Sequence, residues 1–247
     1  MNVAAAAFVL APALALGSFL NVVIARVPAR RSILRPPSSC GSCGSEIPWR
    51  DNIPLVSYGL LRGRCRNCDT RISPTYPLVE TVSALLIVAC FTVWGVTTEA
   101  ALAAGCCAVL VALSVIDAID GIVPNRIVVP AAGLALVAHT AIDPSIAWIA
   151  WALVAAAGVL LVALADPKVG RMGDVKLALL LGAVLGSTVT VALTLGLFAA
   201  LVSAAVLASR RRSLQKMGGL LVPFLSGGAV VALFSGGAIL DSYLGLF

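Results

Sequence analysis

The feature that most constrains this chain is a series of long apolar segments that carry almost no charge. Uncharged apolar segments of roughly 18 residues or more are typical of transmembrane helices. Only 11% of the residues are charged and 60% are hydrophobic, whereas soluble domains carry about 25% charged residues. A chain of this composition has too little polar surface to face water on all sides. The sequence therefore predicts an integral membrane protein.

The apolar segments predict an all-α polytopic membrane protein with about eight transmembrane helices. We place a break at Gly186-Ser187 because the apolar segment around it is too long for one crossing of a bilayer. The first segment precedes the arginines, whereas a secretory signal begins with its basic region, so we expect an uncleaved first helix. The predicted helices cover residues 3–25, 78–97, 100–116, 127–142, 145–165, 175–187, 188–208 and 219–240.

The positions of the charged residues predict the orientation of these helices. If successive loops alternate between two faces, all 17 lysine and arginine residues lie on one face. Lys and Arg mark the cytoplasmic side, so we expect the N-terminus outside and the basic loops inside. The net charge of +6 then reflects this topology and contact with anionic lipid. It does not indicate a nucleic-acid site, because no basic stretch is interleaved with aromatic residues. The predicted cytoplasmic loops are 26–77, 117–126, 166–176 and 209–218.

The first cytoplasmic loop contains two Cys-x2-Cys pairs, "CGSC" at 40–43 and "CRNC" at 65–68. This pattern is typical of a structural zinc site in which each pair lies on a tight turn. Two disulfides are disfavoured on the reducing cytoplasmic side, and an iron–sulfur cluster is the other alternative. We therefore expect a zinc-ribbon-like domain at 26–77, inserted between a first helix at 1–25 and a catalytic bundle at 78–247. The predicted zinc ligands are Cys40, Cys43, Cys65 and Cys68.

Acidic residues within or beside membrane spans are candidates for function because their burial is costly. Asp117 ends the third predicted helix and Asp174 begins the sixth, so both are expected at the cytoplasmic edge. Two aspartates that meet there can share a proton, so that one activates water and the other polarises a peptide carbonyl. This is the chemistry of aspartic proteases. Alternatively, each aspartate caps its helix or pairs with Arg126 or Lys176, and spacing alone does not decide between these interpretations.

Several segments together resemble the bacterial type IV prepilin peptidases, which are intramembrane aspartic proteases of the GxGD type. In that family a Pro-Asn or Pro-Asp pair begins seven residues after the first catalytic aspartate, which selects Asp117. The second motif selects Asp174, and the position of its first glycine, 171, is arginine here. The matching segments are "GSFLNVVIARVP" (17–28), the cysteine segment (40–68), "SPTYPLVE" (73–80), "DAIDGIVPN" (117–125) and "GDVKL" (173–177).

The resemblance implies an activity. The enzyme would cut the short basic leader of type IV prepilins and pseudopilins after a glycine, on the cytoplasmic side of the inner membrane. Relatives with the cysteine domain usually also methylate the new N-terminal residue with S-adenosylmethionine, so a bifunctional peptidase and N-methyltransferase is expected. No glycine-rich nucleotide motif follows a strand, so the sequence assigns no residues to the methyl donor.

The remaining polar residues of these motifs are expected to have auxiliary roles. Gly173 allows close approach of the backbone. Lys176 either tunes the electrostatics of Asp174 or binds lipid phosphate. Glu80 is either a charge at a helix N-terminus or a contact for the amine of the substrate. The auxiliary residues are Asp120, Gly173, Lys176, Pro124, Asn125 and Glu80.

Other functions were weighed against this one. A monofunctional leader peptidase would lack methyl transfer. An ion-coupled transporter would use the aspartates as ion ligands, but transporters tend to show internal repeats and charges near mid-membrane, which we do not find. A zinc module that acts only as an assembly scaffold leaves the aspartate pair unexplained. His139, the only histidine, lies near the predicted outer end of its span, which excludes histidine-based catalysis at the cytoplasmic edge. The default oligomeric state is a monomer, because a bundle of this size can enclose its own site.

Overall fold

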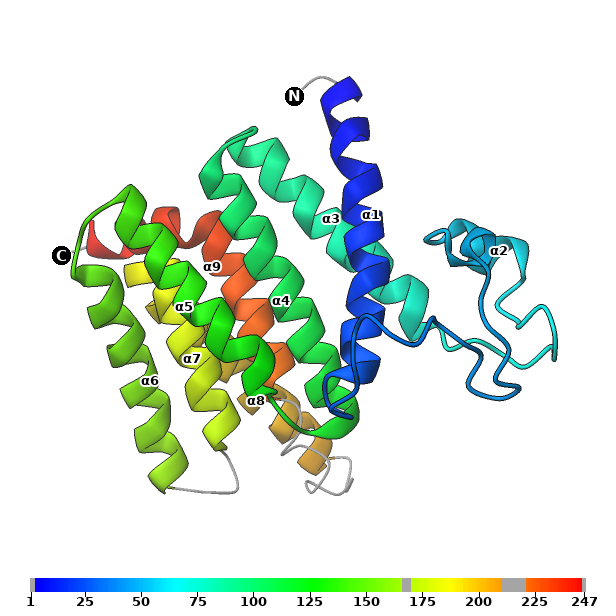
Figure 1. The fold of residues 1–247 in the computed structure, drawn as a ribbon. Helices are drawn as coiled ribbons and strands as arrows, with labels where there is room; N and C mark the ends of the chain where they lie inside the picture. Colours follow the sequence, from blue (N-terminus) through cyan, green and yellow to red (C-terminus); the bar gives the residue numbers. More distant parts are fainter. Residues whose placement is uncertain (1–2, 166–169, 210–220, 246–247) are drawn as a thin grey trace. The chain divides into compact units, whose positions relative to one another are not determined.

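The computed structural model describes residues 3–165, 170–209 and 221–245, and its regular structure in these ranges is helical (Figure 1). The predicted all-α class is therefore confirmed. The basic residues Lys168, Arg210, Arg211, Arg212 and Lys216 lie outside the described residues. The helices are α1 (Val3–Arg26), α2 (Val56–Leu60), α3 (Thr75–Trp94), α4 (Thr98–Asp120), α5 (Asn125–Ile142), α6 (Ala147–Ala165), α7 (Met172–Leu185), α8 (Val189–Ser209) and α9 (Leu221–Leu244), with 3-10 turns η1 (Trp49–Asn52) and η2 (Gly186–Thr188).

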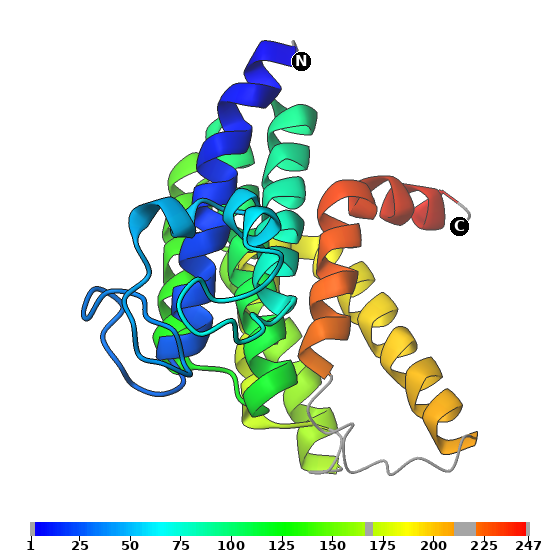
Figure 2. The same ribbon diagram turned by 90° about the vertical axis from the view of Figure 1, so that its right-hand side faces the viewer.

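The long helices of the described ranges agree with the predicted spans. Seven stretches are long and apolar enough to cross a membrane, and one of them, Met172–Val206, contains both α7 and α8. The predicted break between these two helices falls on η2, where Gly186 has a φ of +57°. The chain changes direction there, and α8 packs along α9 and only slightly against α7 (Figures 1 and 2).

The helix α7 is shorter than a full crossing. Its 14 residues span about 21 Å at a rise of about 1.5 Å per residue, whereas the hydrocarbon core is about 30 Å thick. Non-helical backbone at membrane depth is tolerated only where protein covers it. The turn η2 meets this condition, because it contacts α6 and α9 and Gly186 is buried against the ring of Trp148.

The chain divides into two compact units, residues 1–112 and 113–247, and α4 runs from the first unit into the second. In the N-terminal unit, α1 packs along α3. The side-chain amide of Asn21 on α1 donates a hydrogen bond of 3.1 Å to the carbonyl oxygen of Tyr76 on α3. The loop with the four cysteines connects α1 to α3, so both of its ends are held by one helix pair.

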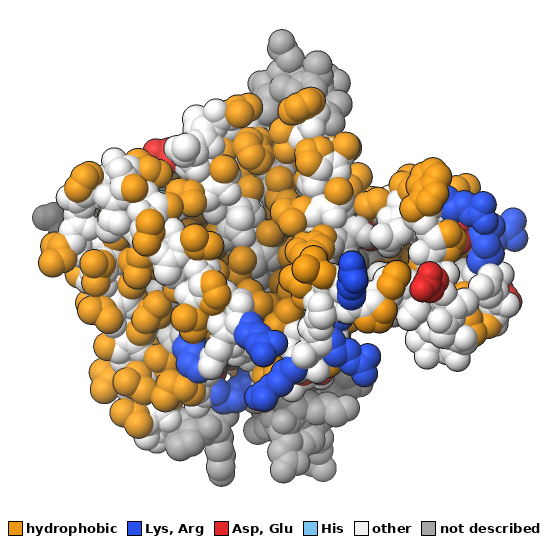
Figure 3. All heavy atoms as spheres, in the orientation of Figure 1, with side chains coloured by type: hydrophobic (Ala, Val, Ile, Leu, Met, Phe, Trp, Pro, Cys, Tyr) orange, Lys and Arg blue, Asp and Glu red, His pale blue; other side chains and the backbone are white. Residues whose placement is uncertain are grey.

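In the C-terminal unit, α7 lies at the centre and packs against α5, α6 and α9. Its residues Leu177, Leu180 and Leu181 are completely or almost completely buried. The faces of α5 and α6 that are turned to the viewer in Figure 3 are covered by apolar side chains, as expected of surfaces that face lipid. Because α7 is surrounded by other helices of this unit, its first turn, which carries Asp174, lies within protein.

The contact between α6 and α7 depends on a glycine, which gives a testable prediction. A Cβ atom at Gly182 would lie 2.6 Å from Cα of Ala152 and 2.5 Å from the carbonyl oxygen of Trp151, and backbone atoms cannot move aside easily. Gly182→Ala is expected to lower the free energy of unfolding by about 1–3 kcal/mol through overpacking. Thermal unfolding in detergent measures the change. Gly158→Ala is the control, because nothing lies within 4 Å of a Cβ atom at Gly158. Equal stability of the two variants would contradict this packing.

Candidate active site and metal centre

Asp117 lies in the last turn of α4, on the face that α4 buries. Leu113 and Ile116 on the same face are fully buried, and Asp117 itself is only 1% exposed. Asp117 comes four residues after Leu113 and directly after Ile116, so it lies on the apolar stripe of the helix. The packing that buries Leu113 and Ile116 therefore also buries the carboxylate of Asp117. Asp120, the last residue of α4, is exposed.

Asp174 lies in the first turn of α7 and is 0% exposed. Its Oδ2 atom accepts a hydrogen bond of 2.8 Å from the backbone N–H of Arg171, so one oxygen of this carboxylate caps the helix. The negative charge also lies at the positive end of the helix dipole. The helix-capping role that was considered for Asp174 from the sequence is therefore performed by one of its two carboxylate oxygens.

The side chain of Arg171 joins the two aspartates. Its Nη2 atom donates a hydrogen bond of 2.6 Å to Oδ1 of Asp117, and its Nε atom lies 4.0 Å from Oδ2 of Asp174. Its Nη1 atom donates to the backbone carbonyl of Gly121. The cation that pairs with Asp117 is thus Arg171, rather than the Arg126 or Lys176 considered from the sequence. The structure brings the two aspartates to a single guanidinium group, although they are far apart in the sequence.

Each aspartate keeps one buried carboxylate oxygen that has no hydrogen-bond partner among the residues the structure describes. The backbone N–H of Val222, in the first turn of α9, interacts with the Asp117 carboxylate, but no described donor makes a hydrogen bond of full geometry to Oδ2 of Asp117 or to Oδ1 of Asp174. Buried polar atoms are nearly always hydrogen-bonded, so two such atoms around one arginine need an explanation. Carboxylate oxygens with this freedom can accept a hydrogen bond from water or donate one to a carbonyl when protonated.

Close backbone contacts hold the motif segments together. A Cβ atom at Gly173 would lie 2.9 Å from a methyl carbon of Val123, so the absence of a side chain lets the start of α7 approach the connection after α4. Gly121 has a φ of +67°, a conformation that favours glycine. This turn points its carbonyl at Arg171. The local structure at both aspartates therefore depends on glycines next to them.

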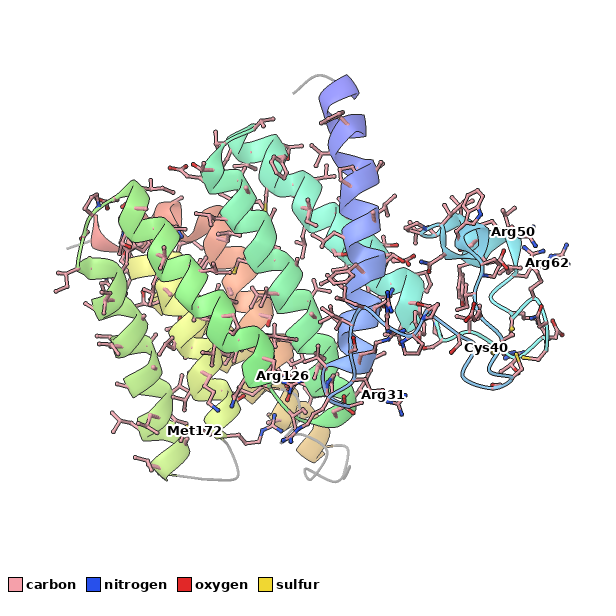
Figure 4. The ribbon with its side chains drawn as sticks, in the orientation of Figure 1. Arg31, Cys40, Arg50, Arg62, Arg126 and Met172 are labelled. Carbon is pink, nitrogen blue, oxygen red and sulfur yellow. The ribbon has the colours of Figure 1, made fainter. Side chains whose placement is uncertain are left out.

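The other auxiliary residues of these motifs tie α5 to α7. Pro124 is the N-cap residue of α5 and has an extended backbone with a φ of −67°, and because proline has no N–H it leaves no donor unpaired at this helix end. The ammonium group of Lys176 donates a hydrogen bond of 2.8 Å to the side-chain oxygen of Asn125. In the structure the partner of Lys176 is thus Asn125. Arg126 and Met172, in the first turns of α5 and α7, are labelled in Figure 4.

Glu80 lies in the N-terminal unit, and the structure gives it a specific partner. Its carboxylate is buried and accepts a hydrogen bond of 2.9 Å from the backbone N–H of Leu55, in the cysteine loop. Leu55 has a φ of +60°, which is unusual for a residue with a branched side chain. Glu80 therefore anchors the cysteine loop to α3.

The two Cys-x2-Cys pairs fold into turns with the same hydrogen-bond pattern. The N–H of Cys40 donates to the carbonyl of Ser45, and that of Cys65 donates to the carbonyl of Thr70, both at 2.9 Å. In each turn the residue four positions after the first cysteine, Gly44 or Asp69, has a positive φ and donates back to that cysteine. The two turns are thus the same structural unit used twice.

The four thiols that these turns present can hold a metal ion. The sulfur atoms of Cys40, Cys43, Cys65 and Cys68 all lie within 4.8 Å of one another, and none of the four forms a disulfide. A tetrahedral site with metal–sulfur bonds of about 2.3 Å has sulfur–sulfur distances of about 3.8 Å, so the cluster fits with a small contraction. Figure 4 shows sulfur atoms gathered beside Cys40 in this loop.

The electrostatics of the cysteine loop differ from thiol to thiol. A hydrogen bond of 2.9 Å with the Ser45 hydroxyl lowers the pKa of Cys43 to about 6. Backbone N–H groups of the second turn, first that of Asn67, lower the pKa of Cys65. The guanidinium of Arg66 makes two hydrogen bonds to Asp51 and lowers the pKa of that carboxyl group.

Sequence reasoning did not assign a role to Arg171. The available signals were that an arginine stands at the first glycine position of the second motif and that it lies three residues before Asp174. Its second partner, Gly121, lies 50 residues away and is presented by a left-handed turn. The motif around Asp174 does not indicate that Arg171 contacts a residue 50 positions away, nor that a left-handed turn presents that residue.

The fold and the site together define a class of protein. It is a polytopic helical membrane protein with two buried aspartates on one arginine and, in a connecting loop, a four-cysteine cluster. The matches with known proteins agree with this class. Residues 12–94 match the Bacterial Peptidase A24 N-terminal domain, and residues 104–209 match the Type IV leader peptidase family. The chain belongs to the type IV leader peptidase family.

Individual relatives support the membership. The chain is 36% identical over 177 residues to a protein of Bacillus subtilis (strain 168) named "Prepilin leader peptidase/N-methyltransferase", and the match covers 70% of this chain and 71% of the relative. It is 47% identical over 133 residues to a protein of the same name from Myxococcus xanthus (strain DK1622), which covers 53% of this chain and 40% of the relative. The chain spans about half the length of several curated relatives, such as 48% of one from Burkholderia pseudomallei (strain 1026b). No solved structure matches.

Proposed function

We propose that this chain is a membrane-embedded aspartic endopeptidase that removes the short basic leader of type IV prepilins and pseudopilins. The observation that carries the proposal is the pair of buried aspartates on one arginine, each with one carboxylate oxygen that no hydrogen bond from the described part of the chain occupies. Its relatives are named prepilin leader peptidases, which supports the same activity and substrate class. Asp117 and Asp174 are the proposed catalytic residues.

In the proposed reaction, the two aspartates carry one proton between them. The ionised carboxylate takes a proton from water while the water oxygen attacks the peptide carbonyl carbon. The protonated carboxyl group gives its proton to the carbonyl oxygen, which forms a tetrahedral intermediate. The intermediate then returns one hydroxyl proton to the carboxylate, the other carboxyl group protonates the leaving nitrogen, and the C–N bond breaks. The pair ends as it began, and no metal takes part.

We propose zinc as the metal of the cysteine cluster, in a structural role. Four thiolates in a tetrahedral cluster are a common zinc ligand set, and they leave no coordination position for a substrate. The cluster lies in the segment 26–77, which we treat as a domain of its own between the first helix at 1–25 and the bundle at 78–247. When bound, zinc supplies four bonds that hold the two turns together.

We also propose N-methylation of the new N-terminal residue, with S-adenosylmethionine as the methyl donor. The names of the relatives and the intact four-cysteine segment support this second activity. The described residues suggest no specific ligands for the donor. A monofunctional leader peptidase is the alternative, and product analysis distinguishes the two.

The proposed location is the cytoplasmic membrane, with the N-terminus outside and the aspartates and cysteine domain at the cytoplasmic side. The distribution of the lysine and arginine residues over the loops supports this orientation. Anionic lipids would then contact the basic loops. Prepilins would reach the site from the side of the membrane on which their basic leaders lie. A monomer would be sufficient to enclose the two aspartates.

The direct test is cleavage of a prepilin by the purified chain in liposomes. We expect one cut that releases the leader, read from the intact mass of the product, and an added methyl group when S-adenosylmethionine is supplied. A prepilin with a bulky residue in place of the glycine before the cut is the substrate control and should stay intact. Ion flux through the liposomes without any cleavage would favour a transporter and refute the peptidase.

A further inference from the structure

We infer that Arg171 is a positioning residue that determines which oxygen of each catalytic aspartate does the chemistry. This inference rests on the proposed function, since it concerns the same pair. Arg171 holds Oδ1 of Asp117 through its side chain and Oδ2 of Asp174 through its backbone N–H. The working oxygens are the other two, Oδ2 of Asp117 and Oδ1 of Asp174, which have no hydrogen-bond partner among the described residues.

The contacts of Arg171 are well suited to fixing an orientation. A guanidinium group is planar and rigid, so its donors point in set directions. One nitrogen is bound to the carbonyl of Gly121, which follows α4, and another is bound to Asp117 within α4. Because one rigid group holds both the end of α4 and the turn that follows it, rotation of the Asp117 carboxylate about its χ angles is restricted.

The charge of Arg171 has a second consequence. Two buried carboxylates repel each other when both are ionised. The guanidinium lies 2.6 Å from Asp117 and within 4.0 Å of Asp174, so its positive charge balances the single negative charge that remains when the pair shares one proton. Its own side chain is 32% exposed, so its charge stays partly hydrated while both aspartates are buried.

The two aspartates depend on Arg171 to different extents. The hydrogen bond to Asp174 comes from the backbone N–H, which every residue except proline retains. The hydrogen bond to Asp117 comes from the side chain and is lost when the side chain is replaced. A substitution at 171 is therefore expected to release Asp117 while the backbone hydrogen bond that caps α7 is retained.

Arg171→Met tests the inference through a split between kcat and KM for leader cleavage. Misplacement of a reacting group by about 1 Å costs up to about 100-fold in rate, so kcat should fall about 10- to 100-fold while KM stays within about twofold. Arg171→Lys keeps the charge and a donor nitrogen but not the planar fork of the guanidinium, and it should recover part of the lost kcat. Arg126→Met is the matched control, because it removes an equal charge from an exposed position in α5.

The outcomes separate this inference from the proposed function. If the wild type does not cleave prepilin, the proposed function fails. If the wild type cleaves and Arg171→Met cleaves with the same or a higher kcat, the peptidase stands and the positioning role is wrong. A fall in kcat that Arg171→Lys does not relieve, together with a lower unfolding temperature than Arg126→Met, would assign Arg171 to stability alone and would also overturn the inference.

Discussion

Asp117→Asn and Asp174→Asn are each expected to lower the rate constant for leader cleavage by at least about a thousand-fold. The amide has the size of the carboxylate, so packing around the buried side chains is conserved. It cannot take a proton from water or carry one to the carbonyl, and acid–base catalysis contributes about 100- to 10,000-fold for each group. Cleavage of a prepilin under single-turnover conditions, followed by gel shift and mass, measures the loss.

Asp143→Asn is the matched control for these two variants. Asp143 is an exposed acid in the connection between α5 and α6 of the same unit, and we expect its amide variant to cleave like the wild type. Binding of the prepilin to the two inactive variants should be retained, because the substitutions leave the surface unchanged. Substantial cleavage by either variant would exclude a pair mechanism and favour a site elsewhere in the chain.

Removal of the metal is expected to unfold the cysteine loop and leave the membrane helices in place. Small metal-bound modules are commonly folded with the metal and unfolded without it. Cys65→Ser should reduce bound zinc from about one ion per chain to none. Trypsin should then cut after Arg64 and Arg66, whose side chains are paired with Asp69 and Asp51 in the folded loop. Helical circular dichroism should change little, because the long helices lie outside the loop.

Cys106→Ala is the control for metal removal, since Cys106 is buried in α4, away from the cluster along the chain. This variant should keep its zinc and its resistance to trypsin. A loop that stays resistant in Cys65→Ser, or in the wild type after chelation, would show that hydrogen bonds such as that between Leu55 and Glu80 fold the loop without a metal.

The helices could be predicted because a bilayer imposes strong rules on the sequence. Long apolar segments have few alternatives to a spanning helix, and the break at Gly186 follows from the length of one such segment. The two cysteine turns were also predictable, because four cysteines at this spacing specify local structure. In both cases the signal and the structure lie within the same few residues.

The details of the site could not be predicted, because they depend on contacts between distant segments. The bond from Arg171 to Asp117 spans 54 residues, and the bond from Leu55 to Glu80 spans 25. Arg171 reaches its partners because Gly121 takes a left-handed conformation and Gly173 leaves room beside Val123. A motif identifies the two aspartates as candidates, but it contains no information on which oxygen each one leaves free.

The central claim, that Asp117 and Asp174 act as one catalytic unit, is tested most directly by a double-substitution cycle. The measured quantity is the single-turnover cleavage rate of Asp117→Asn, Asp174→Asn and the doubly substituted chain. Groups that act as a unit are strongly non-additive, so the double variant should retain about the same residual rate as either single variant. A double variant whose loss equals the product of the two single losses would contradict the account, because it would mean that the aspartates contribute independently.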